Sequence, residues 1–228
     1  MIIGTGMIAK AFKNYENDLD IIIFASGVSN STNATEADYI REKQLLESII
    51  NKYPKSTLVY FSTCSIHDPE LNHCSYVSHK LAIEKFIQEY CKNYFIFRLS
   101  QVVGKTNSPT LINFFVYKIV NKEPFHIWEH STRNLIDVMD VFKISDYCIK
   151  NSLFLNEITN IATPFSLPVF SIVSIVEELC GYKGIYDIQN RGGSYNIDIK
   201  KIASHLDFIN ISFNEDYPYK IIKKYFFS

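Results

Sequence analysis

The sequence lacks the long apolar run that a membrane-spanning helix needs. Its longest runs, such as "DIIIFASG" and "YFIFRLSQVVG", are short and are interrupted by Gly, Ser or Arg, whereas a bilayer span takes roughly 20 apolar residues. The opening "MIIGTG" has no basic segment and no cleavage site of the kind that precedes a secreted domain. We therefore expect neither a membrane protein nor a secreted precursor.

Blocks of like charge and clusters of metal-binding residues are also missing. The formal net charge is −1 with no run of one sign, which argues against a nucleic-acid partner or an anionic membrane surface. The five cysteines form no CxxC, and the six histidines show no metal-ligand spacing. A reduced, cytoplasmic protein without a metal site fits these patterns best.

What the chain does have is the size and composition of one globular unit. Its 228 residues are 47% hydrophobic and 21% charged, enough to bury a sizeable core. Apolar strand-like runs alternate with segments of helical periodicity, which predicts βαβ units and a parallel sheet covered by helices on both faces. We expect strands near residues 2–3, 21–25, 58–62, 95–100, 126–128, 135–138, 159–162 and 184–188.

The pattern loosens after about residue 150. We therefore expect an α/β, Rossmann-like dinucleotide-binding domain over residues 1–150 and a small C-terminal α+β substrate lobe over residues 151–228, continuous with it. In the first part, a helix is predicted from Thr35 to Asn51, with Thr35 as its cap. Its inner side is expected to carry Ala37, Ile40, Leu45 and Ile49.

A glycine turn follows the first predicted strand. In "IIGTGMIAKAF", Gly4 and Gly6 lie between a strand and a helix, and Ala9 occupies the third small position of a G-x-G-x-x-G/A motif. Glycines there let the backbone approach a pyrophosphate. A tight turn without a ligand is the alternative, because the motif alone is weak.

The second strand of the dinucleotide-binding fingerprint is missing. That strand usually ends in an acidic residue about 20 positions after the glycines, which binds the adenosine ribose. Here only "KNYENDLD" separates the first helix from "IIIFASG", and Asp18 and Asp20 both lead into the next strand. The adenosine half of the site is therefore truncated or rebuilt.

In "YFSTCSIHD" the predicted strand ends in a group of hydroxyl residues, Ser62, Thr63 and Ser65. Tyr76 and Lys80 follow this group. The i, i+4 spacing of Tyr76 and Lys80 places both on one face of a helix that begins near Ser75. The structural alternative for the hydroxyl residues is a hydrogen-bonded turn, and the structural alternative for Tyr76 and Lys80 is an exposed pair on a helix. The motifs before and after Tyr76 and Lys80 favour a catalytic pair.

Six blocks resemble a known family in order and spacing. "GTGMIA", "FASGVSNS", "FSTCSIH", Tyr76-x-x-x-Lys80, "FRLSQVVG" and "RNLIDVMDV" are similar to blocks of the extended short-chain dehydrogenases/reductases, and more narrowly of the NAD-dependent epimerase/dehydratase family that modifies nucleotide sugars. The resemblance covers nearly the whole chain except the second and third strands. It implies an NAD- or NADP-dependent enzyme that binds a nucleotide sugar, with surface polysaccharide sugar biosynthesis as the setting.

The resemblance also implies roles for single residues. Tyr76 would be the general acid/base, Thr63 would share the substrate oxygen, and Lys80 would bind the nicotinamide ribose. An ammonium near a phenol, together with the positive nicotinamide, lowers a phenol pKa from its reference of about 10. The remaining cofactor residues would be Gly4, Gly6, Met7, Ile8, Ala25, Ser26 and Val102, and the substrate residues Ser65, Ser100, Gln101, Arg133 and Arg191.

The neighbours of Thr63 narrow the reaction. Dehydratases of the family follow this hydroxyl with an Asp-Glu pair, and 3,5-epimerising reductases place a cysteine two positions after it. Here these positions hold Cys64 and Ser65, which disfavours both reactions. Reduction of a keto-sugar, with C4 as the expected carbon, is the favoured reaction. A 4-epimerase, or a sugar-nucleotide binder that has lost its cofactor, is the alternative.

Two further features leave alternatives open. Arg133 matches a family position that contacts a substrate phosphate, and a salt bridge to Asp137 or Asp140 is its structural alternative.

The missing strand would leave the first strand at a sheet edge, which proteins cover or pair. We expect either a homodimer that covers this edge or loose adenosine binding with poor discrimination between NADH and NADPH.

Overall fold

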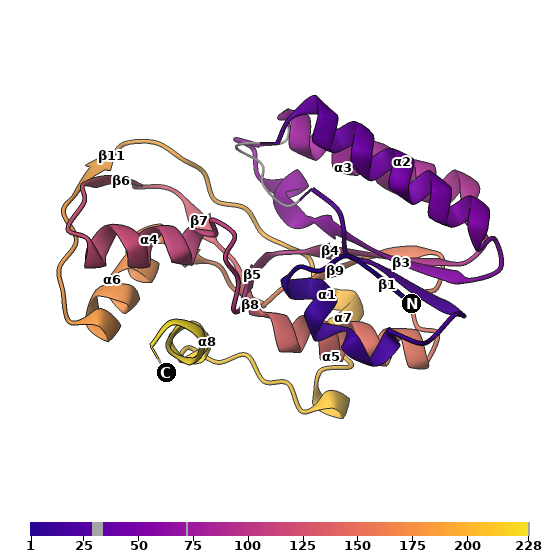
Figure 1. Cartoon of the computed structure of the whole chain (residues 1–228). Coiled ribbons are helices and arrows are strands. Elements are labelled where there is room, and N and C mark those ends of the chain that lie inside the picture. Colours follow the sequence, from indigo (N-terminus) through magenta and orange to yellow (C-terminus); the bar gives the residue numbers. More distant parts are fainter. Residues whose placement is uncertain (29–33, 72, 228) are drawn as a thin grey trace.

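The computed structural model describes residues 1–28, 34–71 and 73–227 as a parallel sheet between two layers of helices, with a second lobe beside it (Figure 1). Within those residues the sheet has the order β1-β2-β3-β4-β9, and every pairing in it is parallel. Its strands are β1 (Ile2–Ile3), β2 (Ile21–Phe24), β3 (Thr57–Thr63), β4 (Tyr94–Leu99) and β9 (Glu157–Ile161). The predicted α/β class is confirmed, and β1 lies at the edge of the sheet, as the missing strand requires.

Alternating side chains of the central strands enter two different cores. Ile23, Val59 and Phe97 face one core, while Ile22, Tyr60 and Ile96 face the other. This two-residue alternation, with apolar residues on both sides, is what a parallel sheet buried on both faces requires. The helices α2 (Glu36–Lys52) and α3 (Ser75–Tyr90) cover one face, and α1 (Met7–Ala11), α5 (Val138–Lys150) and α7 (Lys200–Ala203) lie on the opposite side (Figure 1).

Helix α2 forms where expected but buries a different side. Thr35 caps it in a capping box with Asp38, as predicted. The expected inner side is wrong in its first turns, because Ala37 is exposed and Ile40 is 49% exposed. The buried positions are instead Glu42 and Leu46. A charged residue therefore occupies the inner face of this helix.

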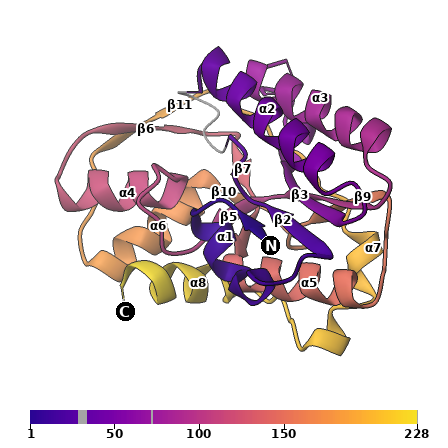
Figure 2. The ribbon, with the colours of Figure 1, turned by 45° about the vertical axis from the view of Figure 1, so that its right-hand side comes forward.

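The second lobe gathers α4 (Leu111–Val120), α6 (Val169–Cys180), α8 (Tyr217–Phe226), β6 (Phe125–Trp128) and β11 (Tyr186–Gln189) around its own core (Figure 2). Strands β6 and β11 pair in parallel. Strand β9, from the C-terminal part, joins the main sheet, whereas α4 and β6 precede residue 150 and join the second lobe. The chain thus crosses between the two cores more than once, and the expected boundary at residue 150 does not coincide with them.

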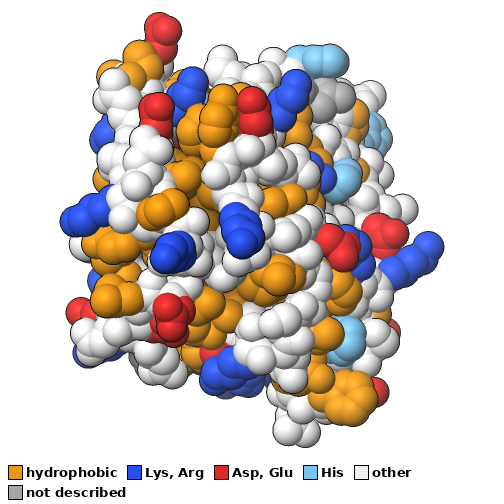
Figure 3. All heavy atoms as spheres, turned by 90° about the vertical axis from the view of Figure 1, so that its right-hand side faces the viewer, with side chains coloured by type: hydrophobic (Ala, Val, Ile, Leu, Met, Phe, Trp, Pro, Cys, Tyr) orange, Lys and Arg blue, Asp and Glu red, His pale blue; other side chains and the backbone are white. Residues whose placement is uncertain are grey.

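Short elements complete the chain. They are the 3-10 helices at Lys13–Tyr15, Cys64–His67 and Asp207–Ile209, and the strands β5 (Gln101–Val103), β7 (Thr132–Arg133), β8 (Leu135–Asp137) and β10 (Leu167–Pro168). Charged side chains of both signs are interspersed with apolar ones on the face in Figure 3, in keeping with the absence of like-charge blocks in the sequence. Among the described residues, no helix is both long and apolar enough to cross a membrane.

Candidate active site

The predicted site residues gather at the carboxyl edge of the sheet. Because β1 to β4 run parallel, the segments that follow them share one edge, where ligands of such folds bind. The turn with Gly4, the segment Ala25–Val28, the turn after Thr63 and the turn with Ser100 all start there. The segment after β2 belongs to "FASGVSNS", of which residues 29–31 lie outside the described part.

The two glycines of the first turn have different surroundings. Gly4 has a φ of +129°, and a Cβ on it would lie 2.4 Å from the Ala25 carbonyl oxygen, so only glycine fits there. Gly6 is the N-cap of α1, and a Cβ on it would meet no atom within 4 Å. An open cleft of about 270 Å³ beside this turn is lined by Ile2, Gly4, Thr5, Ala9, Lys10, Lys13 and Glu16.

The other expected cofactor residues vary in how open they are. Ile8, Ala25 and Val102 are partly buried and pack against the core with one side. The Met7 side chain reaches toward Gly104, where a Cβ would lie 2.6 Å from its sulfur. The Ser26 hydroxyl accepts a hydrogen bond of 3.4 Å from Arg41.

Thr63 and Tyr76 lie side by side at the end of β3. The Thr63 hydroxyl donates to the Ser65 hydroxyl over 2.9 Å and accepts from the Ser65 backbone N–H over 3.0 Å. Burial raises the pKa of Tyr76 to about 12, and a hydrogen bond with the Thr63 side chain opposes this rise. The structure thus brings Thr63, Ser65 and Tyr76 together.

Lys80 lies one helical turn after Tyr76, but its charge is paired elsewhere. Its Nζ atom is 6.0 Å from the centroid of the Tyr76 ring. It donates to Glu42 over 3.1 Å and to the Tyr60 hydroxyl over 2.9 Å. The resemblance implies a lowered Tyr76 pKa with the positive nicotinamide bound, whereas in the protein alone burial raises this pKa and the charge of Glu42 adds to the rise.

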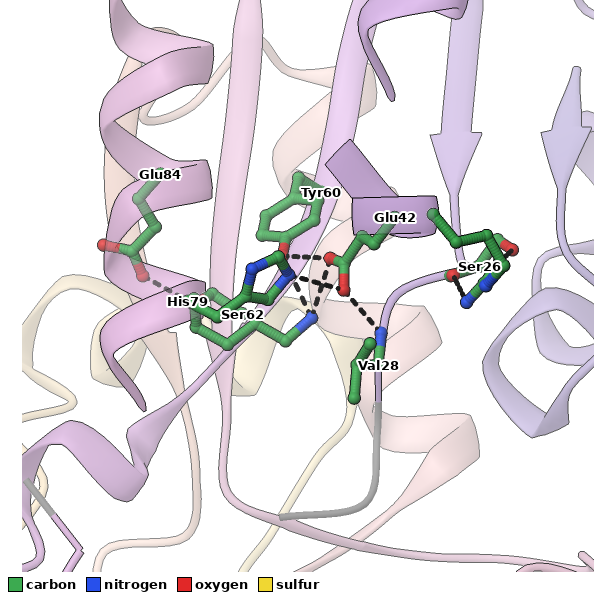
Figure 4. A network of polar contacts seen from close by, with 9 residues as sticks. Ser26, Val28, Glu42, Tyr60, Ser62, His79 and Glu84 are labelled. Carbon is green, nitrogen blue, oxygen red and sulfur yellow. Dashed lines mark hydrogen bonds and ion pairs between the residues drawn. The ribbon is translucent and has the colours of Figure 1, made fainter. Parts of the chain in front are cut away.

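Glu42 is the centre of this network, and sequence reasoning missed it. Its carboxylate accepts hydrogen bonds from the Val28 N–H over 2.6 Å and the Tyr60 hydroxyl over 2.6 Å, and it contacts His79 Nε2 at 3.0 Å (Figure 4). Glu42 is completely buried. The only signal in the sequence was an acidic residue one turn before Leu46 on the inner side of α2, where a charge needs partners.

Cys64 follows Thr63 but is not a reactive thiol. Its sulfur is buried and donates to the Arg98 carbonyl oxygen over 3.2 Å. Burial raises the pKa of this thiol to about 12, and a thiol acts as nucleophile or base in its thiolate form. The position after Thr63 therefore supplies no acid/base group for dehydration.

Arg133 faces the turn after β3. Its Nη1 atom donates to the Thr132 carbonyl oxygen over 2.7 Å and lies 3.9 Å from the buried carboxylate of Asp68. Asp137 caps α5 and binds Lys224 and Tyr225 instead, and Asp140 binds Tyr217. The structural alternative for Arg133 in the sequence analysis is therefore wrong, and Asp68 is its acidic neighbour.

The remaining substrate candidates are spread over the lobe boundary. Ser100 Oγ is buried and has no hydrogen-bond partner among the described residues, so a polar ligand atom could satisfy it. Gln101 lies in β5 and donates its N–H to Asn134. Arg191 lies over the Trp128 ring at 4.6 Å, and Gly193, two residues on, approaches Pro69 of the turn after β3.

These features fit a bound dinucleotide. The space at Gly6 and the unpartnered Ser100 hydroxyl lie at the carboxyl edge of the sheet, and the cleft extends from the glycine turn along β1 and α1. Among the described residues, no group of three or more His, Cys, Asp or Glu side chains could hold a metal ion. A sheet of this order, with a glycine turn after its first strand and a Tyr-x-x-x-Lys helix beside it, has the architecture of the extended short-chain dehydrogenases/reductases.

Within that class the chain belongs to the NAD-dependent epimerase/dehydratase family, whose family model matches residues 6–162. No curated protein matched it. Among solved structures it is similar to the Thermus thermophilus UDP-glucose 4-epimerase in complex with NAD, with a TM-score of 0.73 and 16% identity over 96% of this chain and 80% of that one.

A second similar structure is RMD from Pseudomonas aeruginosa complexed with NADPH. Its TM-score is 0.71 at 13% identity, covering 98% of this chain and 97% of that one. A third is the UDP-N-acetylglucosamine 4-epimerase of Methanobrevibacter ruminantium, with a TM-score of 0.68 and 18% identity over 92% and 78% of the two chains. At such identities the likeness establishes the fold.

Proposed function

We propose that this chain reduces a nucleotide-linked keto-sugar, at C4, with NADH or NADPH as the hydride donor. Surface polysaccharide sugar biosynthesis is the setting we propose for it. The observation that carries the proposal is the group formed by Thr63, Tyr76 and Lys80 at the carboxyl edge of the sheet. The two epimerases among the similar structures are named for UDP-sugar substrates, which supports a nucleotide sugar as the substrate class.

Each of the three residues has a chemical task that its position permits. Tyr76 would give its phenolic proton to the oxygen of the carbonyl as that oxygen gains charge. The Thr63 hydroxyl would donate a hydrogen bond to the same oxygen, because it already lies beside the Tyr76 hydroxyl. Lys80 would hold the ribose next to the nicotinamide, and its ammonium, partly offset by Glu42, would add to the positive charge of the oxidised nicotinamide in favouring the phenolate.

Arg133 and Arg191 are proposed to hold the diphosphate of the substrate. A planar guanidinium suits phosphate oxygens. The partial exposure of Arg133 and its long 3.9 Å contact with Asp68 leave donors free for such a contact. Arg191 is exposed and is placed by its contact with Trp128.

A screen of nucleoside diphosphate 4-keto-sugars tests the proposal. Consumption of NADH or NADPH would be followed with each keto-sugar, and the product would be identified by its sugar configuration. We expect cofactor oxidation with at least one of them. A 4-epimerase would instead interconvert the alcohols with no net oxidation, and a protein that binds neither cofactor would fail the proposal altogether.

A further inference from the structure

Glu42 is a buried carboxylate that the proposed reaction does not use. It lies on α2, and all of its described contacts converge on the site: Lys80 and His79 of α3, Tyr60 of β3 and the Val28 backbone after β2 (Figure 4). Leaving a charge uncompensated in such a place is costly. The arrangement therefore constrains Lys80 as much as it constrains Glu42.

The backbone after β2 closes over this ion pair. A Cβ on Gly27 would lie 2.7 Å from Lys80 Nζ and 2.9 Å from Glu42 Oε1, so the glycine lets the main chain pass directly over both charges. Gly4 packs in turn against Ala25 of the same segment. A continuous set of contacts thus runs from the glycine turn, through the segment after β2, to Lys80.

We propose that Glu42 is a positioning residue, whose carboxylate holds the Lys80 ammonium beside Tyr76 and ties it to the segment that follows β2. The inference rests on the proposed function, in which Lys80 binds the cofactor ribose. It gives the carboxylate a task beyond filling the core. The carboxylate keeps Lys80 charged and in place before any ligand binds. It also weakens the electrostatic effect of Lys80 on Tyr76.

The electrostatics agree with this geometry. Burial lowers the pKa of Lys80, and the charge of Glu42 opposes that effect. Burial would raise the pKa of Glu42, but its contacts with His79, Lys80, Tyr60 and Val28 lower it to about 2. The titratable and charged groups that face Lys80 and Tyr76 are Glu42 and Tyr39 on α2, Tyr60 on β3, and Cys74, His79 and Glu84 on or next to α3.

The test measures the titration of Lys80 directly. Protein containing isotope-labelled lysine would be titrated by NMR without added cofactor, with the Lys80 resonance assigned through a Lys80→Arg variant. We expect Glu42→Gln to lower the Lys80 midpoint by about 1 to 3 pH units, because an opposite charge in contact favours the ionised form by that amount. An unchanged midpoint would overturn the proposal.

A matched control separates positioning from mere stabilisation. Glu177 is also buried, pairs with Lys183 over 2.7 Å and accepts from the Gly184 N–H over 2.8 Å, but it lies in the second lobe. Glu177→Gln likewise removes the charge of a buried carboxylate that binds a lysine and a backbone N–H, so the melting temperature of this variant should fall while the Lys80 midpoint stays in place. If both variants moved the midpoint equally, the effect would be one of general stability and the proposal would be wrong.

Cofactor affinity supplies the functional measurement. The dissociation constant for NADH, measured against pH, should begin to rise at a lower pH in Glu42→Gln than in the parent protein, because Lys80 loses its proton earlier. Should Glu42→Gln not fold, Glu42→Asp carries the test, with a smaller shift expected in the same direction and an unshifted midpoint counting against the proposal. A parent protein without NADH binding would refute the proposed function, while the lysine titration would still decide the role of Glu42.

Discussion

Gly4 and Gly6 lie in the same turn, but they meet different surroundings. Gly4 combines a left-handed φ with contact against the Ala25 carbonyl, whereas Gly6 has an ordinary φ of −73° and open space around it. A side chain at Gly4 would strain the backbone and collide with Ala25, just after β2, while a side chain at Gly6 would reach only into open space. The two glycines of one sequence motif thus have different roles: Gly4 is required by the backbone, and Gly6 is available to a ligand.

Gly6→Val is therefore expected to weaken binding of the dinucleotide while the protein stays folded. The branched side chain would stand where the pyrophosphate must approach. Calorimetric titration with NADH and NADPH, beside a thermal melt, measures both properties. Gly4→Ala is the matched control and should lower the melting temperature. Unimpaired cofactor binding by Gly6→Val would make the turn purely structural.

Tyr76→Phe tests the acid/base residue. The substitution keeps the buried ring but removes the proton that Tyr76 would give to the carbonyl oxygen, so turnover should fall by about 10²- to 10⁴-fold. The dissociation constant for the cofactor should hardly change, because the ring remains in place. The measurement is the steady-state rate on the keto-sugar identified in the screen. If the variant keeps more than about a tenth of the parent activity, Tyr76 is not the acid/base residue.

At the scale of elements, the periodicity of the sequence predicts where helices and strands form. It does not always predict which face of a helix is buried. The apolar runs of β2, β3 and β4 were predicted within a residue or two, since both of their faces are apolar. On α2 the apolar residues Ala37 and Ile40 suggested an inner side, but Glu42 is buried there. A charge enters a core only with partners from other elements, here Tyr60, His79 and Lys80, and their proximity depends on the tertiary fold.

The same limit explains the other misses in the candidate site. Thr63, Tyr76 and Lys80 were predicted from the Tyr-x-x-x-Lys spacing and from the family resemblance of the blocks around it, and all three lie close together in the sequence. Asp68 was missed as the neighbour of Arg133, since the two lie far apart in the chain and meet only when β7 packs against the turn after β3. The strands β5, β7 and β10 are two or three residues long, too short for a periodic pattern.

Helix α2 also has a consequence for stability in acid. The pKa of Glu42 is lowered from 4.5 to about 2, so its ionised form stabilises the folded protein above the unfolded pKa. That contribution, about 3 kcal/mol from the size of the shift, should be lost as the pH falls from about 4.5 toward 2. Denaturant unfolding at a series of pH values should show a steeper loss in the parent protein than in Glu42→Gln. Parallel curves would contradict this prediction.

At the scale of the whole molecule, the missing strands leave one side of the sheet open. Strand β1 has β2 as its only neighbour in the described sheet. Asp18 cannot replace the missing ribose-binding carboxylate, because its side chain accepts from the Asp20 and Ile21 N–H groups at the opposite end of β2 from the ligand edge. The cleft beside the glycine turn offers Lys10, Lys13 and Glu16 instead, and all three are exposed.

This arrangement predicts one of two behaviours in cofactor binding. Either a second copy of the chain covers the open edge and completes the adenosine pocket, or the adenosine is held loosely. In the second case NADH and NADPH should bind with similar affinity, since telling a 2′-hydroxyl from a 2′-phosphate needs a fixed carboxylate or arginine. The charged side chains that line the cleft, Lys10, Lys13 and Glu16, are of both signs and exposed.

Dissociation constants for both cofactors, measured across a protein dilution series with the mass of the particle followed in parallel, separate the two behaviours. Affinity that falls as a dimer dissociates would support the shared pocket, because the adenosine would lose contacts that the partner copy supplies. Equal and concentration-independent affinities for NADH and NADPH would support loose binding. Tight NADH binding by a monomer with strong rejection of NADPH would contradict both, and would assign ribose recognition to the short segment of residues 13–20 alone.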